Sequence, residues 1–273
     1  MHPQDPRTPL NITALRSRLV ARGPLARIEH VETTGSTNTD LVAMAKQGAP
    51  AWTVLFAEHQ SQGRGRMGRR YESPSGAQLT LSLLLRPPAS CVQRLGLMPL
   101  ATGLALVDAL PKDAGIKVKW PNDLIIEHRK LCGILAEAVS LGPEPAVVIG
   151  LGLNTSLRRD ELPVPHATSL ELEGIAYERN ELAAQVMLSL HHRLSQWQDN
   201  DPALIEDYRA VCATIGTEVR VILPGDKELL GTAINVSDAG LLLVRDDAGE
   251  VHELSAGDVF HLRAQHGGYG VGQ

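Results

Sequence analysis

The sequence contains few aromatic residues and few cysteines. Only 3% of its 273 residues are Phe, Trp or Tyr, so the aromatic stacking platforms that bind single-stranded nucleic acid are not expected. The three cysteines, Cys91, Cys132 and Cys212, are too far apart in sequence for a C-x-x-C redox pair or a metal knuckle. A sparse, odd set of cysteines is typical of a reducing compartment. We therefore expect a cytoplasmic protein with no metal site of its own.

Long apolar runs are also missing. The longest, Leu79–Leu85 and Ala146–Leu153, fall well short of the roughly 18 residues that suggest a membrane span. The first ten residues, MHPQDPRTPL, have no apolar core and so do not form a signal peptide. The formal net charge is −5, which argues against a protein that coats nucleic acid. We expect neither a membrane nor a nucleic acid as a partner.

The sequence pattern changes near residue 214. Before that point helix and strand patterns alternate, whereas after it about five short strand patterns follow one another, separated by turns rich in Gly and Asp. This predicts an α/β (α+β) fold, with a mixed β-sheet packed by helices over residues 26–214 and a small all-β barrel over residues 215–265. Residues 1–25 are expected to be loosely ordered apart from a short helix, and residues 266–273 to form a flexible tail.

Individual elements can be predicted from periodicity and from turn residues. Helices are expected to begin at Thr37 and to cover Leu95–Leu110 and Glu181–Trp197. Strands are expected at Trp52–Glu58, Gln78–Leu85, Ile116–Trp120, Leu124–Ile126, Ile134–Ser140 and Ala146–Leu153.

The run G-R-G-R-M-G-R-R at residues 63–70 matches the G-x-G-x-x-G pattern of dinucleotide-binding turns. Such a turn must open a helix and be followed about 20 residues later by an acidic residue. Here Y-E-S-P-S-G follows, and no acidic residue occurs between Glu72 and Asp108. The run instead offers arginine side chains that match phosphate or carboxylate oxygens. It is either an anion-binding loop or a solvated surface loop.

The second informative run is K-V-K-W-P-N-D-L at residues 117–124. Proline forces an extended chain before it, so Asn122 and Asp123 are expected in a turn between two strands. Lys119 and Lys130 are then expected on adjacent strands of a short hairpin. Two ammonium groups in one pocket repel each other unless an anion lies between them.

Two further segments have a structural and a functional interpretation. Gly150 and Gly152 interrupt a buried strand, which indicates either a β-bulge or the close approach of a ligand. Gly35-Ser36-Thr37-Asn38 places hydroxyl and amide groups at the start of a helix, where they can cap the helix or bind a polar ligand.

Taken in order, the segments S-T-N, G-R-G-R-x-G-R, K-W-P-N-D, R-K-L-x-G-I-L and G-x-G-x-N closely resemble the biotin–protein ligase family, over roughly residues 30–263. The resemblance implies an SH3-like C-terminal barrel. It also implies a two-step reaction in which biotin and ATP, with Mg²⁺, give biotinyl-5′-AMP, and biotin is then transferred to a lysine of a biotin carboxyl carrier domain. The implied enzyme is a biotin–[acetyl-CoA-carboxylase] ligase, either a monomer or a homodimer.

The resemblance also implies roles for individual residues. The catalytic set is Lys130, Arg64, Arg66, Lys119 and Asp123. The biotin-binding set is Ser36, Thr37, Asn38, Gln60, Gly63, Arg64, Lys130, Gly133, Ile134, Gly150 and Gly152. The ATP and adenylate set is Arg66, Arg69, Tyr71, Lys119, Trp120, Asn122 and Asn154. For Asp123 we hypothesise that it orients or deprotonates the incoming acceptor lysine, so that Asp123→Asn spares adenylate synthesis and slows transfer.

The sequence departs from the family pattern in three places. Only 34 residues precede Gly35, too few for the DNA-binding winged helix of some members, so we expect the monofunctional type. Tyr71 stands where many members have Trp, and Met67 where several have another arginine. Three alternatives remain: a lipoate or octanoate ligase, which shares the fold; a nucleic-acid-binding regulator that uses the Arg-Gly loop; and a catalytically inactive biotin sensor.

Overall fold

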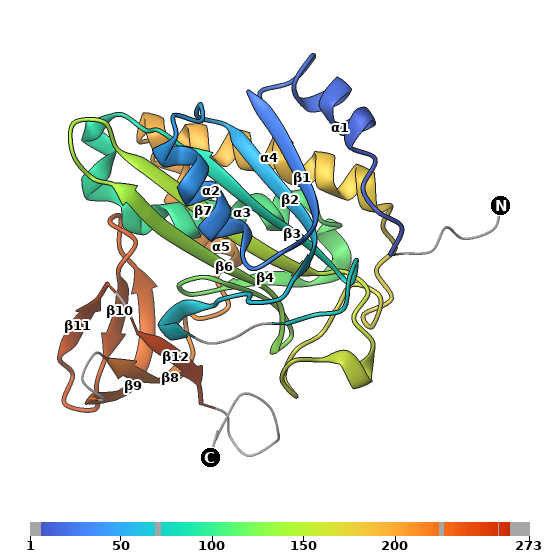
Figure 1. Cartoon of the computed structure of the whole chain (residues 1–273). Helices are drawn as coiled ribbons and strands as arrows, with labels where there is room; N and C mark the ends of the chain where they lie inside the picture. Colours follow the sequence, from blue (N-terminus) through green and yellow to red (C-terminus); the bar gives the residue numbers. More distant parts are fainter. Residues whose placement is uncertain (1–6, 69–71, 224–226, 256, 263–273) are drawn as a thin grey trace.

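The computed structural model describes residues 7–68, 72–223, 227–255 and 257–262 (Figure 1). Within these residues the strands form two separate sheets, one in the N-terminal two thirds of the chain and one in the C-terminal part. The division lies between the end of helix α5 at Val211 and the start of strand β8 at Glu218.

The larger sheet is mixed, as predicted. Among the described residues its seven strands have the order β1-β2-β3-β7-β6-β5-β4. Strands β1 and β2 are parallel, and every other neighbouring pair is antiparallel. The strands are β1 (Arg27–Thr34), β2 (Thr53–Gln60), β3 (Gln78–Leu85), β4 (Ile116–Lys119), β5 (Asp123–Ile126), β6 (Arg129–Ser140) and β7 (Ala146–Asn154).

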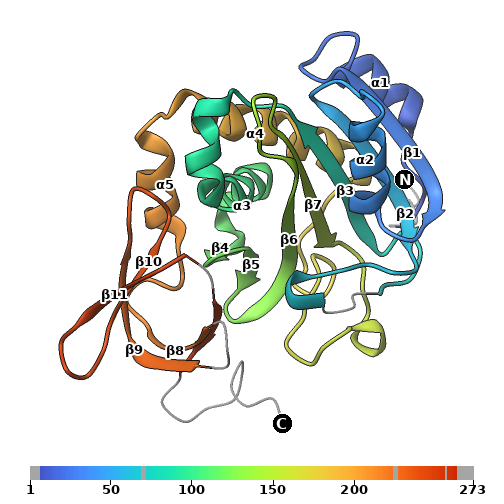
Figure 2. The same ribbon diagram turned by 60° about the vertical axis from the view of Figure 1, so that its left-hand side comes forward.

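Helices cover the two faces of this sheet unequally (Figure 2). Helix α3 packs on one face over β4, β5 and β6, and α4 packs on α3; α2 packs on the other face, over β2, β3 and β7. The α-helices are α1 (Ile12–Leu19), α2 (Thr37–Lys46), α3 (Met98–Ala109), α4 (Arg179–Asp199) and α5 (Ala203–Val211). In the described parts of the chain, the connections contain four 3₁₀ segments, η1 (Arg66–Gly68), η2 (Ala89–Leu97), η3 (Lys112–Ala114) and η4 (Arg159–Glu161).

Side-chain alternation separates a core face from a polar face in the centre of the sheet. In β3 the residues Leu79, Leu81, Leu83 and Leu85 belong to the main hydrophobic core beneath α3 and α4. The intervening positions of β3 are Gln78, Thr80, Ser82 and Leu84, and only the last of these joins the small cluster under α2. Because successive strand residues point to opposite faces, three buried polar residues of β3 face the same side as α2.

The predicted helix Leu95–Leu110 forms in two parts. The 3₁₀ segment η2 ends at Leu97, and α3 begins at Met98 with a proline in its first turn, where a missing N–H costs nothing. Together, Ala89–Ala109 are long and apolar enough to pass a length-and-composition test for a membrane span. Burial explains that composition, because α3 is the central core helix and its residues from Leu100 to Leu106 are all buried.

From Arg7 onward the N-terminal segment is anchored, in contrast to the expected loose order. The Arg7 guanidinium donates to the carbonyl oxygen of Ser156 at 2.7 Å and pairs with the Glu161 carboxylate, whose pKa falls to about 2. Arg179 donates to the carbonyl oxygen of Thr8 at 2.8 Å. Leu10, Leu15 and Leu19 are buried in the main core. Local composition shows the prolines and arginines here but not their distant partners.

The C-terminal part is an all-antiparallel β domain, in agreement with the predicted short strands. Its five strands within the described residues have the order β11-β10-β9-β8-β12. They are β8 (Glu218–Leu223), β9 (Lys227–Val236), β10 (Leu242–Arg245), β11 (Val251–Leu254) and β12 (Asp258–His261). The domain sits beside the β4–β5 end of the main sheet and adjoins α5 in both ribbon views (Figures 1 and 2).

Buried hydrogen bonds join the two parts at the end of β4. The Trp120 indole N–H donates to the carbonyl oxygen of Gly240 at 3.0 Å, and the Trp120 backbone N–H donates to Oγ1 of Thr214 at 3.0 Å. The Nε2 atom of His261 lies 3.1 Å from the same Thr214 oxygen. Burial, together with the positive charge of Lys119, lowers the pKa of His261 to about 4.

This buried histidine makes stability pH-dependent. An unfolded histidine titrates near pH 6.5, so between pH 6.5 and 4 the unfolded chain binds a proton that the native protein excludes. The free energy of unfolding is therefore expected to fall by about 2 kcal/mol from pH 7 to pH 5 because of His261 alone. Urea unfolding gives the free energy of unfolding of the protein and of His261→Gln at pH 7 and at pH 5. The contribution of His261 is the fall between the two pH values in the unchanged protein minus the fall in the variant. Equal losses in the two proteins would contradict it.

Candidate functional site

One row of residues crosses the polar face of the main sheet. Strand register places Lys119 opposite Asp123, Asp123 opposite Gly133, Gly133 opposite Gly152, and Gly152 opposite Thr80. Directly opposed residues point to the same face, so these five positions share one surface. The two adjacent glycines leave a strip without side chains between the charged end of the row and the threonine.

Lys130 joins this row because of a β-bulge. On a regular strand residues 130 and 133 would point to opposite faces, since the side-chain period is two. The register of β5 with β6 shifts between Leu124, which pairs with Cys132, and Ile125, which pairs with Lys130. Leu131 is thus an extra residue, and such a bulge re-aims the side chains beyond it. A Cβ built on Gly133 would lie 3.3 Å from the Lys130 Nζ atom.

The bulge brings Lys130 into an ion pair. Its Nζ atom lies 2.7 Å from Oδ1 of Asp123, and the two side chains are only 21% and 16% exposed. The predicted hairpin neighbours, Lys119 and Lys130, are not on adjacent strands, because β5 lies between β4 and β6. Asp123 on β5 therefore separates the two lysines. This carboxylate pairs with Lys130 and stands at the strand position opposite Lys119.

The start of α2 approaches the same face from the other end. The helix begins at Thr37, as expected, and its N-cap is Ser36, whose Oγ accepts from the backbone N–H of Thr39 at 3.5 Å. The backbone N–H of Thr37 instead donates to Oε1 of Gln60 at 2.8 Å, and its hydroxyl donates to the same oxygen at 2.9 Å. The three residues Ser36, Thr37 and Gln60, predicted as biotin ligands, thus lie together.

Asn38 and Gly150 are adjacent. A Cβ on Gly150 would lie 2.1 Å from Oδ1 of Asn38, so the absence of a side chain makes room for this amide. The Asn38 Nδ2 donates to the Glu137 carboxylate at 2.5 Å, and its Oδ1 accepts from the Ser82 hydroxyl at 2.6 Å. Both neighbouring strands keep their register through Gly150 and Gly152, so the β-bulge interpretation of these glycines is wrong. Gly152 has only ordinary contacts, at 3.7 Å from Gln78.

The Arg-Gly loop reaches the site from the end of β2. Gly63 is buried and Arg64 is exposed. Arg66 donates to Oδ1 of Asn122 at 3.1 Å and to the carbonyl oxygen of Gly257 in the C-terminal β domain at 3.4 Å. The Asn122 Nδ2 in turn donates to the carbonyl oxygen of Ile134 at 2.8 Å. Arg69, Tyr71 and the side chain of Met67 lie outside the described residues.

Two residues that were predicted to bind the nucleotide have other partners in the structure. The Trp120 side chain is 2% exposed and bound to Gly240, so its indole packs between the two sheets. Asn154 is fully buried: its Oδ1 accepts from Gln78 at 2.6 Å, and its Nδ2 donates to the carbonyl oxygen of Thr168 at 2.7 Å. Both residues support the backbone around the site. Lys119 is 6% exposed and its position in the row faces the site.

Sequence reasoning missed polar residues of β3. Gln78, Thr80 and Ser82 are all buried on the polar face, and Ser82 Oγ lies 2.8 Å from Oγ1 of Thr37. Their signal was the alternation in Q-L-T-L-S-L, in which polar residues recur at every second position of a strand. Alternation shows that one face is polar, but the partner strands that make it a site are distant in sequence.

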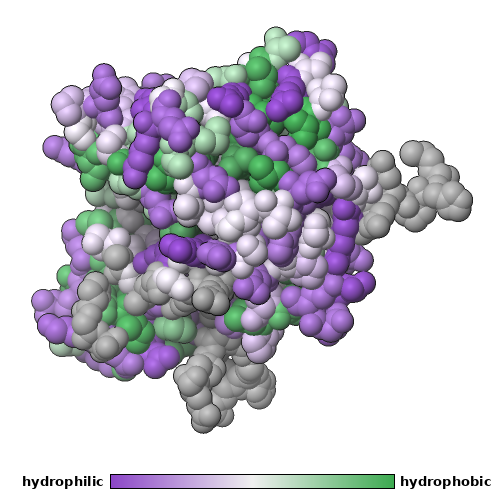
Figure 3. All heavy atoms as spheres, viewed as in Figure 1, coloured by the Kyte–Doolittle hydropathy of each residue, from purple (hydrophilic) through white to green (hydrophobic). Residues whose placement is uncertain are grey.

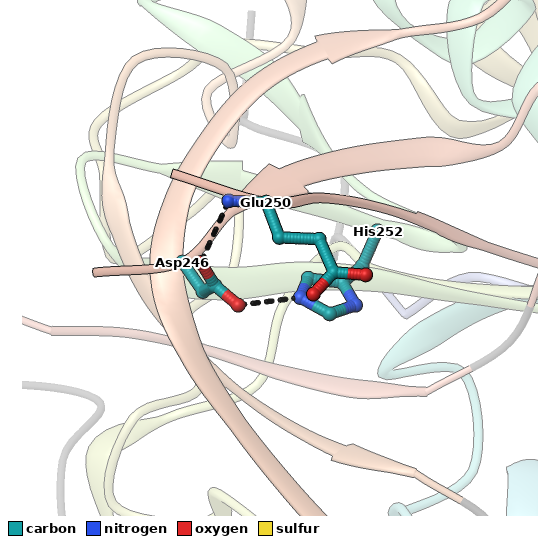
Figure 4. Close-up of side chains that lie close together, drawn as sticks. All are labelled: Asp246, Glu250 and His252. Atoms are coloured by element: carbon teal, nitrogen blue, oxygen red, sulfur yellow. Dashed lines mark hydrogen bonds and ion pairs between the residues drawn. The ribbon is translucent and has the colours of Figure 1, made fainter. Parts of the chain in front are cut away.

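One group of possible metal ligands lies in the C-terminal β domain. Within the described residues, Asp246, Glu250 and His252 bring three ligand atoms within 4.8 Å (Figure 4). Asp246 already accepts from the backbone N–H groups of Ala248 and Glu250 at 3.0 and 2.9 Å, and from His252 at 2.7 Å. His252 is also the main reason that the pKa of Asp246 is lowered. These contacts close the β10–β11 turn.

Comparison with known proteins identifies related sequences. The Biotin/lipoate A/B protein ligase family matches residues 31–154, and the Biotin protein ligase C terminal domain matches residues 214–262. A biotin--[acetyl-CoA-carboxylase] ligase of Mycobacterium tuberculosis is 42% identical over 94% of this chain and 97% of that protein. The bifunctional ligase/repressor BirA of Escherichia coli is 33% identical over 82% of this chain and 70% of that protein.

Solved structures have the same fold. The biotin protein ligase from Aquifex aeolicus in complex with biotin and ATP aligns with a TM-score of 0.73 at 24% identity, over 87% of this chain and 99% of that one. The enzyme from Leishmania major in complex with biotinyl-5-AMP aligns with a TM-score of 0.56 at 26% identity, over 84% of this chain and 99% of that one. With the sequence identity to the mycobacterial protein across nearly the whole length, the chain belongs to the biotin protein ligase family.

Proposed function

We propose that the protein is an ATP-dependent biotin–protein ligase. It forms biotinyl-5′-AMP from biotin and ATP and transfers biotin to a lysine of a biotin carboxyl carrier domain of a carboxylase. The observation that carries this proposal is the pairing of Lys130 with Asp123 at one end of the side-chain-free strip made by Gly133 and Gly152. The strip accepts a flat apolar ligand, and the lysine marks the end at which its carboxylate would lie.

The polar groups around the strip suit the two ends of biotin. At the α2 end, Ser36, Thr37 and Gln60 offer hydroxyl and amide groups for the ureido ring. At the β5 end, Lys130 attracts the carboxylate through charge. Asn38 with its Ser82 and Glu137 partners fixes the wall beside Gly150. Such an arrangement, mostly small residues with a few placed polar groups, is typical of small-ligand sites.

In the first step, a carboxylate oxygen of biotin attacks the α-phosphorus of ATP, and the bond to the bridging oxygen breaks with release of pyrophosphate. Two anions must approach each other, so cationic side chains lower the barrier. The strands of Lys119 and Lys130 lie on either side of the strand of Asp123, and Arg66 of the Arg-Gly loop, which also carries Arg64, reaches Asn122. We assign Lys130 to the biotin carboxylate and α-phosphate, Lys119 to the other phosphates and the arginines to the adenylate. Asn122, Asn154 and Trp120 are assigned to shaping the nucleotide side.

In the second step, the amine of the acceptor lysine attacks the carbonyl carbon of the mixed anhydride, and AMP leaves. The attacking amine must be neutral, so a base beside it speeds the reaction. We assign this role to Asp123, whose side chain is only 16% exposed and lies at the same end of the strip as Lys130. Its ion pair with Lys130 holds both groups at the place where the two steps occur.

Magnesium enters this proposal only with ATP. The carboxylates of the described site are Asp123, paired with Lys130, and Glu137, bonded to Asn38. Neither offers a carboxylate pair to a metal, and Mg²⁺ commonly binds through substrate phosphates and water. The described side chains therefore do not form a metal cage, and no step is assigned to the ion.

The architecture supports the remaining assignments. We assign biotin and ATP binding to residues 26–214 and regard residues 215–265 as an SH3-like barrel that supports the nucleotide side through Arg66 and Trp120. Hydrophilic side chains separate the apolar patches on the face shown in Figure 3, and buried free cysteines agree with a reducing cytoplasm. We infer no nucleic acid or membrane partner, and a monomer or homodimer.

Removal of the Lys130 ammonium tests the proposed reaction. Lys130→Ala is expected to reduce biotin-dependent adenylate formation by about a hundredfold or more, because it removes a cation from the reacting groups. Chromatography of α-labelled ATP after a single turnover measures the product. Lys117→Ala on the same motif, whose side chain is exposed, serves as the control. Adenylate formed with lipoate but not with biotin would move the protein to the lipoate ligases.

Asp123→Asn separates the two steps. The amide cannot accept a proton, so transfer to the acceptor lysine is expected to slow by about tenfold to a hundredfold. Adenylate synthesis is expected to fall less, although Lys130 loses an ion-pair partner. Purified biotinyl-5′-AMP mixed with a carrier domain measures transfer alone, and the α-labelled ATP assay measures synthesis. Equal losses in both steps would rule out the assigned role.

Gly152→Ala tests whether biotin binds over the strip made by Gly133 and Gly152. Gly152→Ala keeps an ordinary 3.7 Å contact with Gln78, so the protein is expected to fold, but its Cβ enters the face where biotin would lie. Biotin affinity is expected to weaken by about tenfold, the effect of roughly 1.4 kcal/mol of overpacking. Titration calorimetry gives the affinity. Gly142→Ala, where nothing lies within 4 Å, should bind biotin like the unchanged protein. Unaltered binding by Gly152→Ala would place biotin elsewhere.

A further inference from the structure

The backbone of Lys130 is held by a segment far away in sequence. Its N–H donates to the carbonyl oxygen of His166 at 2.7 Å, and its carbonyl oxygen accepts from the N–H of Thr168 at 2.9 Å. Lys130 and Ala167 thus form an isolated parallel bridge. The segment belongs to residues 155–178, which connect β7 to α4 and lie outside both matched family ranges.

This segment replaces a strand neighbour that Lys130 lacks. The pairing of β6 with β7 begins only at Cys132, opposite Leu153. On its other side Lys130 lies next to the bulged residue Leu131, where the regular ladder with β5 is interrupted. Without His166 and Thr168, the Lys130 N–H would lose this partner, and on the β7 side the carbonyl oxygen would keep the longer hydrogen bond from Nδ2 of Asn154, at 3.4 Å. Residues 166–168 therefore stabilise the bulge that points the lysine at Asp123.

Glu173 connects residues 166–168 to strand β6 through hydrogen bonds. Its carboxylate accepts from Nε of Arg129 at 2.9 Å and from Nη2 at 2.8 Å, a two-point contact with the residue next to Lys130. It also accepts from the hydroxyl of Thr168, which is 2% exposed. Burial acts to raise the pKa of Glu173, but the hydrogen bonds from Arg129 and Thr168 lower it overall. The carboxylate is thus charged and joins both sides of the bridge.

We propose that Thr168 and Glu173 are positioning residues for Lys130: they hold Arg129 and the backbone of Lys130, directly before the bulge in β6, so that the lysine ammonium stays against Asp123. Neither side chain needs to touch a substrate. This inference rests on the proposed function, because it assigns the role of Lys130 in adenylate formation to a geometry that these two residues maintain. A displacement of about 1 Å at a reacting group can cost a hundredfold in rate.

Substitutions of nearly unchanged shape test the proposal. Thr168→Val removes the hydroxyl, and Glu173→Gln removes the charge that pairs with Arg129. Each is expected to lower the single-turnover rate of biotinyl-5′-AMP formation by about tenfold at saturating biotin and ATP, because a poorly placed lysine remains after both substrates are bound. The KM values for the two substrates should change less than the rate. Thr168→Ser restores the hydroxyl and should restore the rate to within about twofold.

A matched control separates positioning from general stability. Glu161 lies on the same connecting segment, and within the described residues its ion pairs are with Arg7 and Arg158 and not with β6. Glu161→Gln should lower the melting temperature about as much as Glu173→Gln while leaving the saturated rate unchanged. A second measurement does not depend on catalysis. Mass spectrometry gives the acetylation rate of Lys130 relative to that of exposed Lys117 in the same molecule, and this ratio reports how accessible the Lys130 amine is. It should be higher in Thr168→Val than in the unchanged protein.

The outcomes distinguish the two proposals. If the unchanged protein forms no biotinyl-5′-AMP, the proposed function fails and this inference fails with it. If it forms the adenylate and Thr168→Val retains a saturated rate within twofold, the positioning role is overturned, whatever the acetylation rate. Equal rate losses in Glu161→Gln and Glu173→Gln would also overturn it, because the effect would then follow stability alone.

Discussion

The one-residue bulge at Leu131 determines which face of the sheet carries Lys130. Strand geometry alone would place residues 130 and 133 on opposite faces, one of which is filled by the apolar core. The extra residue puts the ammonium beside Gly133 and within 2.7 Å of Asp123. A positive charge turned toward the core would be very costly. The position of this charge therefore depends on a local irregularity in β6, and the rest of the site is organised around it.

One face of the main sheet packs in the apolar core, and the other face carries the residues of the site. Leucines at every second position of β3, together with apolar residues of β7, fill the core beneath α3. At the positions between them, Leu84 and Val148 pack in the small cluster under α2, whereas the others are small or polar. A methyl group lost from the core would cost stability, whereas a methyl group added at Gly152 would cost space for a ligand. This division explains why glycines occur in a buried strand, where they are otherwise unfavourable.

Much of the fold follows from local sequence pattern, and less of the site does. Periodicity and turn residues were sufficient for the mixed sheet and for the five C-terminal strands. The prediction that Lys119 and Lys130 lie on adjacent strands was wrong, because β5 lies between their strands. Strand order of this kind is not contained in local pattern. The anchored segment after Arg7 and the support of Lys130 by residues 166–168 depend on hydrogen bonds between distant residues. Local pattern contains the donors and acceptors but not their pairing.

The K-W-P-N-D motif serves two purposes at once. Lys119, Asn122 and Asp123 face the site, whereas Trp120 between them turns into the boundary with the C-terminal β domain and donates to Gly240. Residues 120–122 form the turn between β4 and β5, so the chain changes direction within the motif and its side chains can point to different surroundings. Arg66 adds a second connection, since it contacts both Asn122 and the carbonyl oxygen of Gly257. A shift of the C-terminal domain would therefore move the motif and the arginine loop together, so the position of that domain is part of the geometry of the site.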